Sequence, residues 1–178
     1  MADVSLVSFP CSAFYGDDKG IIDAGDLPAT PDNNDGRAGI KFVDGSDEHA
    51  AVSYSFRMPS QYGGSNNLKV SLASHGDAAP GANNGVRWNV ACEAITESDA
   101  HDLQGGGDYF AAPQALTGTV DANAGELNID EITFTNAQAD GVQPGDIFRL
   151  CIRRDSDHAD DTYADSVWLL EVQILDVQ

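Results

Sequence analysis

The segment Phe148-Arg-Leu-Cys-Ile-Arg153 alternates large apolar side chains with mostly polar ones. Successive side chains of a β-strand point to opposite faces, so Phe148, Leu150 and Ile152 would share one buried face. The same period of two recurs along the chain in both directions, whereas a helical period is nearly absent. Only the segment from 97 to 103 could form a short helical turn. The sequence therefore predicts an all-β protein.

We expect about eight strands: one at the N-terminus, six between Ala51 and Arg154, and one at the C-terminus. A change of apolar face near Asp130-Glu131 predicts a β-bulge there. Eight antiparallel strands with long loops fit a single jelly-roll-like β-sandwich, with an immunoglobulin-type sandwich as the alternative. The expected core residues include Phe56, Trp88, Leu150 and Trp168, and the last strand is expected to bury Trp168, Leu170, Val172 and Ile174 together.

The N-terminal quarter differs in composition from the rest of the chain. Between Cys11 and Ser46 it is dense in Gly, Asp, Pro and Asn, with Ile40 and Phe42 as a short strand. We therefore divide the 178 residues into a loop-rich N-terminal arm, 1–46, integrated with the domain, and a β-sandwich domain, 47–178.

The charge balance excludes several classes of partner. The chain has 29 acidic and 9 basic residues, a formal net charge of −20. Such a protein is repelled by phosphate backbones and by anionic membranes, so we expect no nucleic-acid and no membrane binding. The acidic residues are mostly Asp, which indicates either many turns or adaptation to a saline medium.

The cysteines and the N-terminus bear on the cellular compartment. Cys11, Cys92 and Cys151 form no CxxC pair, and an odd number cannot close a full set of disulfides. No secretion signal and no apolar run of membrane-spanning length is visible. We expect synthesis in a reducing cytoplasm.

The segment Arg153 to Asp165 holds five aspartates and one histidine and admits two interpretations. One is a calcium loop formed by Asp155, Asp157, Asp160 and Asp161, although the EF-hand spacing fails. The other, which we favour, is a structural loop in which Arg153 or Arg154 pairs with Asp155, Asp160 or Asp161. We expect neither a resident metal nor a cofactor.

No catalytic motif is present. The sequence lacks a Gly-x-Ser-x-Gly elbow and a phosphate-binding loop, and its histidines are scattered. We expect no enzymatic activity. Aromatic residues that could instead contact a sugar or a neighbouring subunit are Phe9, Phe14, Tyr15, Tyr62, Tyr109 and Phe110.

Several segments resemble structural proteins of tailed-bacteriophage virions. They are Phe42-Val-Asp-Gly-Ser-Asp-Glu, Tyr54-Ser-Phe-Arg-Met-Pro, Val86-Arg-Trp-Asn-Val, Val142-Gln-Pro-Gly-Asp-Ile-Phe-Arg-Leu-Cys-Ile-Arg-Arg-Asp-Ser-Asp, Asp160-Asp-Thr-Tyr and Val167-Trp-Leu-Leu-Glu-Val-Gln-Ile. The resemblance implies a jelly-roll domain of the head decoration or cement type. It covers most of the chain from about Lys41 onward.

Three functions follow as expectations. The first is a capsid decoration protein on the outer surface of the virion, which binds the major capsid protein and sister subunits as a homotrimer. In that case residues 1–46 would reach across to the shell or to a sister subunit, and their deletion would abolish binding to capsids while leaving the sandwich folded. The second is a tail-fibre or receptor- and carbohydrate-binding module. The third is a glycan hydrolase, for which the sequence contains no supporting motif.

Overall fold

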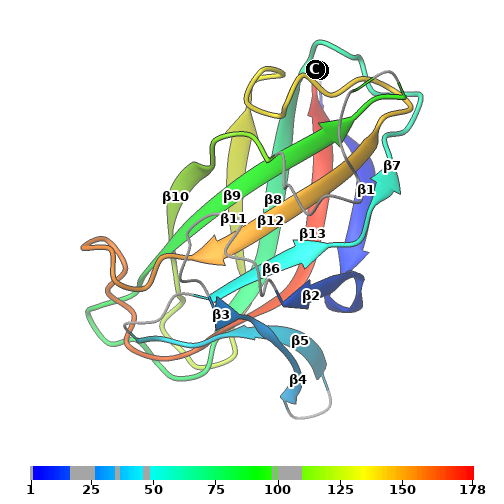
Figure 1. Cartoon of the computed structure of the whole chain (residues 1–178). Coiled ribbons are helices and arrows are strands. Elements are labelled where there is room, and N and C mark those ends of the chain that lie inside the picture. Colours follow the sequence, from blue (N-terminus) through cyan, green and yellow to red (C-terminus); the bar gives the residue numbers. More distant parts are fainter. Residues whose placement is uncertain (1, 17–26, 35–36, 46–48, 98, 100–109) are drawn as a thin grey trace.

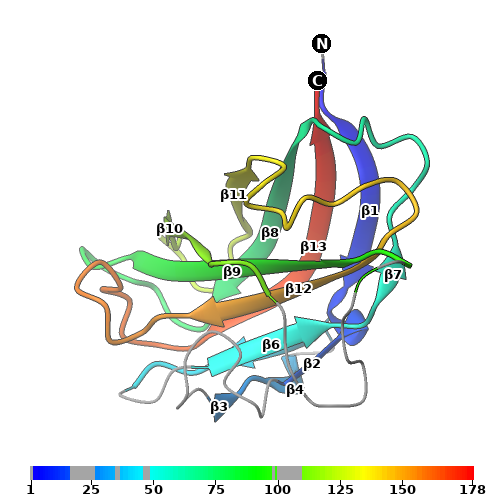
Figure 2. The same ribbon diagram turned by 45° about the horizontal axis from the view of Figure 1, so that its top comes forward.

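The computed structural model describes residues 2–16, 27–34, 37–45, 49–97, 99 and 110–178. Two sheets face each other, and their strands cross when the molecule is viewed through the sandwich (Figures 1 and 2). Sheet A has the order β11 (Asn128–Phe134), β8 (Asn67–Gly76), β13 (Val167–Val177), β5 (Arg37–Phe42) and β4 (Thr30–Asn34), with β1 (Val4–Pro10) also paired to β13.

Sheet B has the order β10 (Gln114–Thr119), β9 (Gly85–Ile95), β12 (Ile147–Arg154), β6 (His49–Ser53) and β2 (Phe14–Gly16). In addition, β3 (Leu27–Pro28) pairs with β6, and β7 (Phe56–Arg57) pairs with β12. A single 3₁₀ turn, η1 (Cys11–Ala13), connects β1 to β2 within the described chain. The described pairings are antiparallel except that of β3 with β6. The all-β sandwich predicted from the alternation is confirmed.

The core lies between the two sheets and consists of the inward residues of both. On β12, Phe148, Leu150 and Ile152 are fully buried in it, as the alternation predicts. Phe42 of sheet A meets Trp88 of sheet B edge to face, with ring centroids 5.3 Å apart. Such contacts between the sheets, together with the burial of apolar area, hold the sandwich together.

The last strand buries a different set of residues from the expected one. The register of β13 against β8 shifts between Leu169 and Glu171, which leaves Leu170 as an extra residue. Leu169, Val172 and Ile174 consequently face the core, and Trp168 lies on the outer face of sheet A. There its indole is 4% exposed because Lys41 and the stacked ring of His75 cover it. Trp168 is therefore buried as predicted, but on the outer face of sheet A and not between the sheets, and the prediction of Leu170 as a core residue is wrong, because a bulge reverses the face.

The bulge predicted near Asp130 is absent. The pairing of β11 with β8 is continuous from Asn128 to Phe134. Ile132 and Phe134 face the core, whereas Leu127 and Ile129 are 57% and 55% exposed. The apparent change of face in the sequence arises because two large apolar residues lie on the outer side.

Residues 1–46 form part of both sheets. The strands β1 and β5 pair with different halves of β13, and β2 pairs with β6. Leu6, Phe9, Phe14, Ile40 and Phe42 are buried in the core. The described parts of residues 1–46 therefore complete the sandwich, and a contact of this segment with the shell or a sister subunit stays a prediction. The missed strands are short and rich in Asp, Asn and Gly, so they lack alternation.

Candidate functional site

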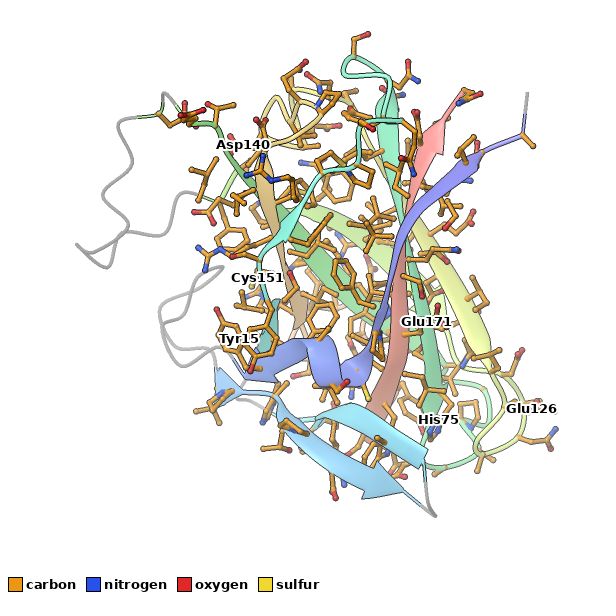
Figure 3. All side chains as sticks on the ribbon, turned by 90° about the vertical axis from the view of Figure 1, so that its right-hand side faces the viewer. Tyr15, His75, Glu126, Asp140, Cys151 and Glu171 are labelled. Atoms are coloured by element: carbon orange, nitrogen blue, oxygen red, sulfur yellow. The ribbon has the colours of Figure 1, made fainter. Side chains whose placement is uncertain are left out.

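The outward residues of sheet B form the candidate site. We use the name sheet B face for the outer side of β9, β12, β6, β7 and β2. Because directly paired residues of neighbouring strands point to the same side, the register orders this face in rows. One row runs across four strands from Ala91 through Cys151 and Val52 to Tyr15. Tyr15 and Cys151 lie on this side in Figure 3, opposite Glu171 and His75 of sheet A.

The centre of this face is apolar. Ala50, Val52, Ala91 and Cys151 form a small cluster separate from the main core, and Phe110 packs on it. All four cluster residues are buried. The centre of this side of sheet B is therefore apolar and buried from solvent.

Two tyrosines form an exposed aromatic pair at the edge of the sheet B face. The ring centroids of Tyr15 and Tyr54 are 5.4 Å apart and the ring planes are tilted by 48°. Tyr15 is 37% and Tyr54 60% exposed. The backbone N–H of Tyr54 donates to the carbonyl oxygen of Ala13 at 2.8 Å, which fixes Tyr54 beside β2.

The register explains why Tyr54 and Phe56 lie on opposite faces. Cys151 pairs with Val52, but Phe148 pairs with Phe56, so the segment between β6 and β7 contains one residue more than the β12 segment opposite it. Val52 and Tyr54 both lie on the outer side, and the extra residue then reverses the face, so that Phe56 packs against the core. From alternation alone Val52, Tyr54 and Phe56 share one face, so the sequence does not distinguish Tyr54 as an exposed residue.

Charged rows flank the tyrosine pair. Glu93 Oε2 lies 2.5 Å from Arg149 Nε, and the guanidinium of Arg149 lies 5.1 Å from the centre of the Phe110 ring. The register places Arg149 alongside Tyr54 and Ser55. Glu93 is buried, so the ion pair is held in a partly desolvated position where it fixes the guanidinium in place.

Arg57 occupies the next row of the same face. It pairs with Ile147 on β12 and is exposed. The spacing of alternate residues along β12 places this row about 7 Å from that of Arg149. Neither Arg57 nor Arg149 was expected as a site residue, because nothing in the sequence distinguishes an outward arginine from a solvated one.

The aspartate segment after β12 is organised by arginine. Arg154 is fully buried, and its Nε and Nη2 donate to the two carboxylate oxygens of Asp161 at 3.0 and 2.8 Å. Arg153 Nη2 lies 3.0 Å from Asp155 Oδ2, to which Asn89 Nδ2 also donates at 2.8 Å. Arg153 and Arg154 are consecutive and therefore form their ion pairs on opposite faces of β12.

The four aspartates of the calcium interpretation do not converge. Asp155 and Asp161 are bound to different arginines, and Asp157 and Asp160 are exposed. Within the described part of the chain, no group of three or more His, Cys, Asp or Glu side chains is arranged to hold a metal ion. The geometry gives the segment a structural role as a braced loop.

Three of the expected contact residues are not available to a partner. Phe9 and Phe14 pack edge to face in the core with centroids 6.0 Å apart, and both are buried. The hydroxyl of Tyr62 donates to the carbonyl oxygen of Asn66 at 2.6 Å, and burial raises its pKa. Their selection as contact residues is wrong, because loop position does not imply exposure. Phe110 is half-buried, and Tyr109 lies outside the described residues.

The cysteines offer no reactive thiol. Cys11, Cys92 and Cys151 are buried and unpaired with one another. Burial, with a smaller contribution from the charge of Asp140, raises the pKa of the Cys92 thiol far above its ordinary range. The described chain also contains no helix long and apolar enough to span a bilayer.

Comparison with known proteins places the chain by fold. No family model matches it, and no curated protein matches it in sequence. A match to a solved xylan-binding module shows that this two-sheet β-sandwich fold also occurs in a carbohydrate-binding module.

Among the individual structures, a xylan-binding module of family 15 has a TM-score of 0.53 at 12% identity, with 97% of this chain and 98% of that chain covered. A 4-O-methyl-α-glucuronidase with specificity for decorated arabinogalactans has a TM-score of 0.52 at 11% identity. The alignment covers all of this chain but only 18% of that enzyme. The structure of an infectious bursal disease virus strain also matches, at a TM-score of 0.41.

Proposed function

We propose that this protein is a non-catalytic carbohydrate-binding β-sandwich that binds one glycan chain on the sheet B face. The observation that carries the proposal is the exposed pair Tyr15 and Tyr54, with centroids 5.4 Å apart. An aromatic ring offers a flat apolar surface to the C–H face of a sugar.

The tilt of the two rings favours a single chain as the ligand. Planes inclined by 48° cannot both lie flat on one extended crystalline surface, but they can contact successive sugars that are twisted relative to one another. Arg149 lies in the adjoining row, where its ion pair with the buried Glu93 holds it in place. The similarity in fold and length to a xylan-binding module supports this proposal.

The proposed function does not include catalysis. Glycoside hydrolysis needs two carboxyl groups on opposite sides of the scissile bond. On this face Glu93 is bound to Arg149, and Asp155 to Arg153 and Asn89. Carboxylates held in such ion pairs orient the arginines and are poorly placed to transfer a proton.

Affinity electrophoresis and calorimetry with soluble polysaccharides test the proposal. We expect binding to at least one of hydroxyethyl cellulose, carboxymethyl cellulose, neutral xylan, glucuronoxylan and galactomannan. Tyr54→Ala should weaken binding about tenfold, a loss of roughly 1.4 kcal/mol, because it removes one stacking surface. Tyr54 is 60% exposed, so the fold should be retained.

Leu127→Ala is the matched control, because Leu127 is 57% exposed at the opposite sheet. Its affinity should equal that of the wild type. Binding to none of the polysaccharides, or an equal loss in both variants, would contradict the proposal.

A second candidate function is a virion component that contacts sister subunits or the major capsid protein on the outer surface of a particle. Leu127 and Ile129 favour it, since two large exposed apolar side chains at the edge of sheet A suit subunit packing. Light scattering should then give the mass of an oligomer, such as the expected trimer, that Ile129→Lys reduces to a monomer. A monomeric wild-type protein would count against self-assembly.

A further inference from the structure

Carboxylates outnumber the basic side chains of this protein by about three to one, and they form ion pairs with nearly all the basic side chains that the structure describes. A carboxylate oxygen lies within 3.8 Å of the charged group in six basic residues: Lys41, Lys69, Arg87, Arg149, Arg153 and Arg154. Among the described side chains Arg57 is the exception, with no ion pair or hydrogen bond of its own. An arginine without a partner in so acidic a chain is available to an external anion.

Arg57 also lies in the right place for a ligand anion. It is exposed, it points outward with its partner Ile147, and it follows Tyr54 by three residues on the sheet B face. Phe56 packs against the core between them, in edge-to-face contact with Phe148 at 5.4 Å between centroids. The backbone that carries Arg57 is therefore anchored, while the side chain is free to adapt.

The other arginines of this face cannot easily take the same role. Arg149 and Arg153 are paired with Glu93 and Asp155, and Glu93 is buried. Breaking such an ion pair to bind a ligand would leave a desolvated charge without a partner. Arg57 requires no such exchange, because it forms no ion pair with the side chains that the structure describes.

The net charge of −20 does not cancel this attraction at contact distance. At physiological salt the field of distant charges decays over about 8 Å, whereas a guanidinium and a carboxylate in direct contact are screened far less. Arginine moreover binds a carboxylate through two parallel hydrogen bonds.

We infer that the glycan bound on the sheet B face carries carboxylate groups, as uronic acids do, and that Arg57 is the specificity residue that holds one of them. This inference rests on the proposed function. The tyrosine pair supplies the stacking surface for the chain, and Arg57 selects its acidic substituent.

The experiment compares two polysaccharides with the same backbone, carboxymethyl cellulose and hydroxyethyl cellulose, and repeats the comparison with glucuronoxylan and neutral xylan. The wild-type protein should bind the carboxylated member of a pair about tenfold more tightly at physiological salt, where the field of the distant negative charges is screened and the direct contact is screened far less. Arg57→Gln should abolish the difference and leave binding of the neutral member unchanged. Arg57→Lys should retain part of it, since the charge remains and the two-bond geometry is lost.

Lys69→Gln is the control, because it changes the net charge by the same amount on the outer face of sheet A, where Lys69 pairs with Asp3 and Glu131. Equal binding of both members of each pair, or an equal effect of Arg57→Gln and Lys69→Gln, would overturn the inference and leave the proposed function standing. Binding to none of the polysaccharides would overturn the proposed function, and the inference with it.

Discussion

Asp130 is a carboxylate placed between the two sheets. It accepts a hydrogen bond from Trp88 Nε1 at 3.2 Å, and a Cβ atom added at Gly118 would lie 2.2 Å from its Oδ2. Burial raises the pKa of Asp130 above its ordinary value, and the hydrogen bonds from Trp88 and from the backbone of Thr119 offset only part of this shift. Gly118 thus makes room for a polar group in an otherwise apolar interior.

Asp130→Asn should alter the pH dependence of stability. A carboxyl whose pKa is raised in the folded state binds its proton more tightly there, so its contribution to stability is full below the unfolded pKa of about 3.9 and is lost as pH rises through the folded pKa. Asparagine does not titrate, so the variant does not lose stability in this way. Its free energy of unfolding should therefore rise relative to that of the wild type between about pH 4 and pH 7. Urea unfolding at several pH values measures the difference, and a difference that does not vary with pH would contradict the assignment.

The loop between β12 and β13 shows how a polar element can be rigid. Arg154 joins Asp161 to the carbonyl oxygens of Tyr163 and Asp165, the latter at 2.6 Å from Nη1. Asp161 also accepts from the backbone N–H of Arg87 at 2.9 Å, which ties the loop to β9. The hydroxyl of Tyr163 donates to the carbonyl oxygen of Ala78 at 2.8 Å, which ties it to a second loop.

Arg154→Met should destabilise the protein by roughly 3–5 kcal/mol, because it leaves the carboxylate of Asp161 buried without its partner. Chemical denaturation measures the change. Arg154→Met combined with Asp161→Leu should recover part of the loss, since neither charge then remains buried. Arg57→Gln, at an exposed arginine without a partner, should change the stability by no more than about 0.5 kcal/mol. A similarly small effect of Arg154→Met would refute the bracing role of the pair.

At the scale of the whole molecule, the two sheets depend on both ends of the chain. Val4 pairs with Asp176, so β1 begins beside the end of β13, as Figure 2 shows. On the same side of β13, β5 pairs with the residues from Val167 to Leu169. Sheet A therefore contains strands from both ends of the chain, and it is complete only when the last strand, β13, is in place.

Deletion of residues 1–46 should abolish cooperative unfolding, because it removes β1 to β5 and buried side chains such as Phe14, Ile40 and Phe42. Circular dichroism during thermal denaturation measures cooperativity. Deletion of residues 1–3, which precede β1, is the control and should cost little beyond the exposed pair of Asp3 with Lys69. A truncated chain, 47–178, that melted cooperatively would show that the N-terminal quarter is dispensable.

The candidate site was only partly accessible from the sequence. Tyr15 was expected as a contact residue and is exposed, but Phe9, Phe14 and Tyr62 were expected beside it and are buried. Alternation alone places Tyr54 on one face with Val52 and Phe56, and it provides no link between Tyr54, Arg57 and Arg149. Their proximity depends on the pairing of β12 with β6 and β7, which joins segments about 100 residues apart.

The sequence by itself determined the class of fold and most of the long strands, because a period of two and the burial of apolar side chains are local properties of the chain. It also determined that Arg153 and Arg154 would be matched by nearby aspartates. Only the tertiary structure decided which side of a strand is buried after a bulge, as between Tyr54 and Phe56 and between Trp168 and Val172, since one extra residue reverses the face of all that follow. It alone decided, too, that Arg57 would lack a carboxylate and lie next to an exposed aromatic pair, because pairing of charges and exposure are set by neighbours distant in sequence.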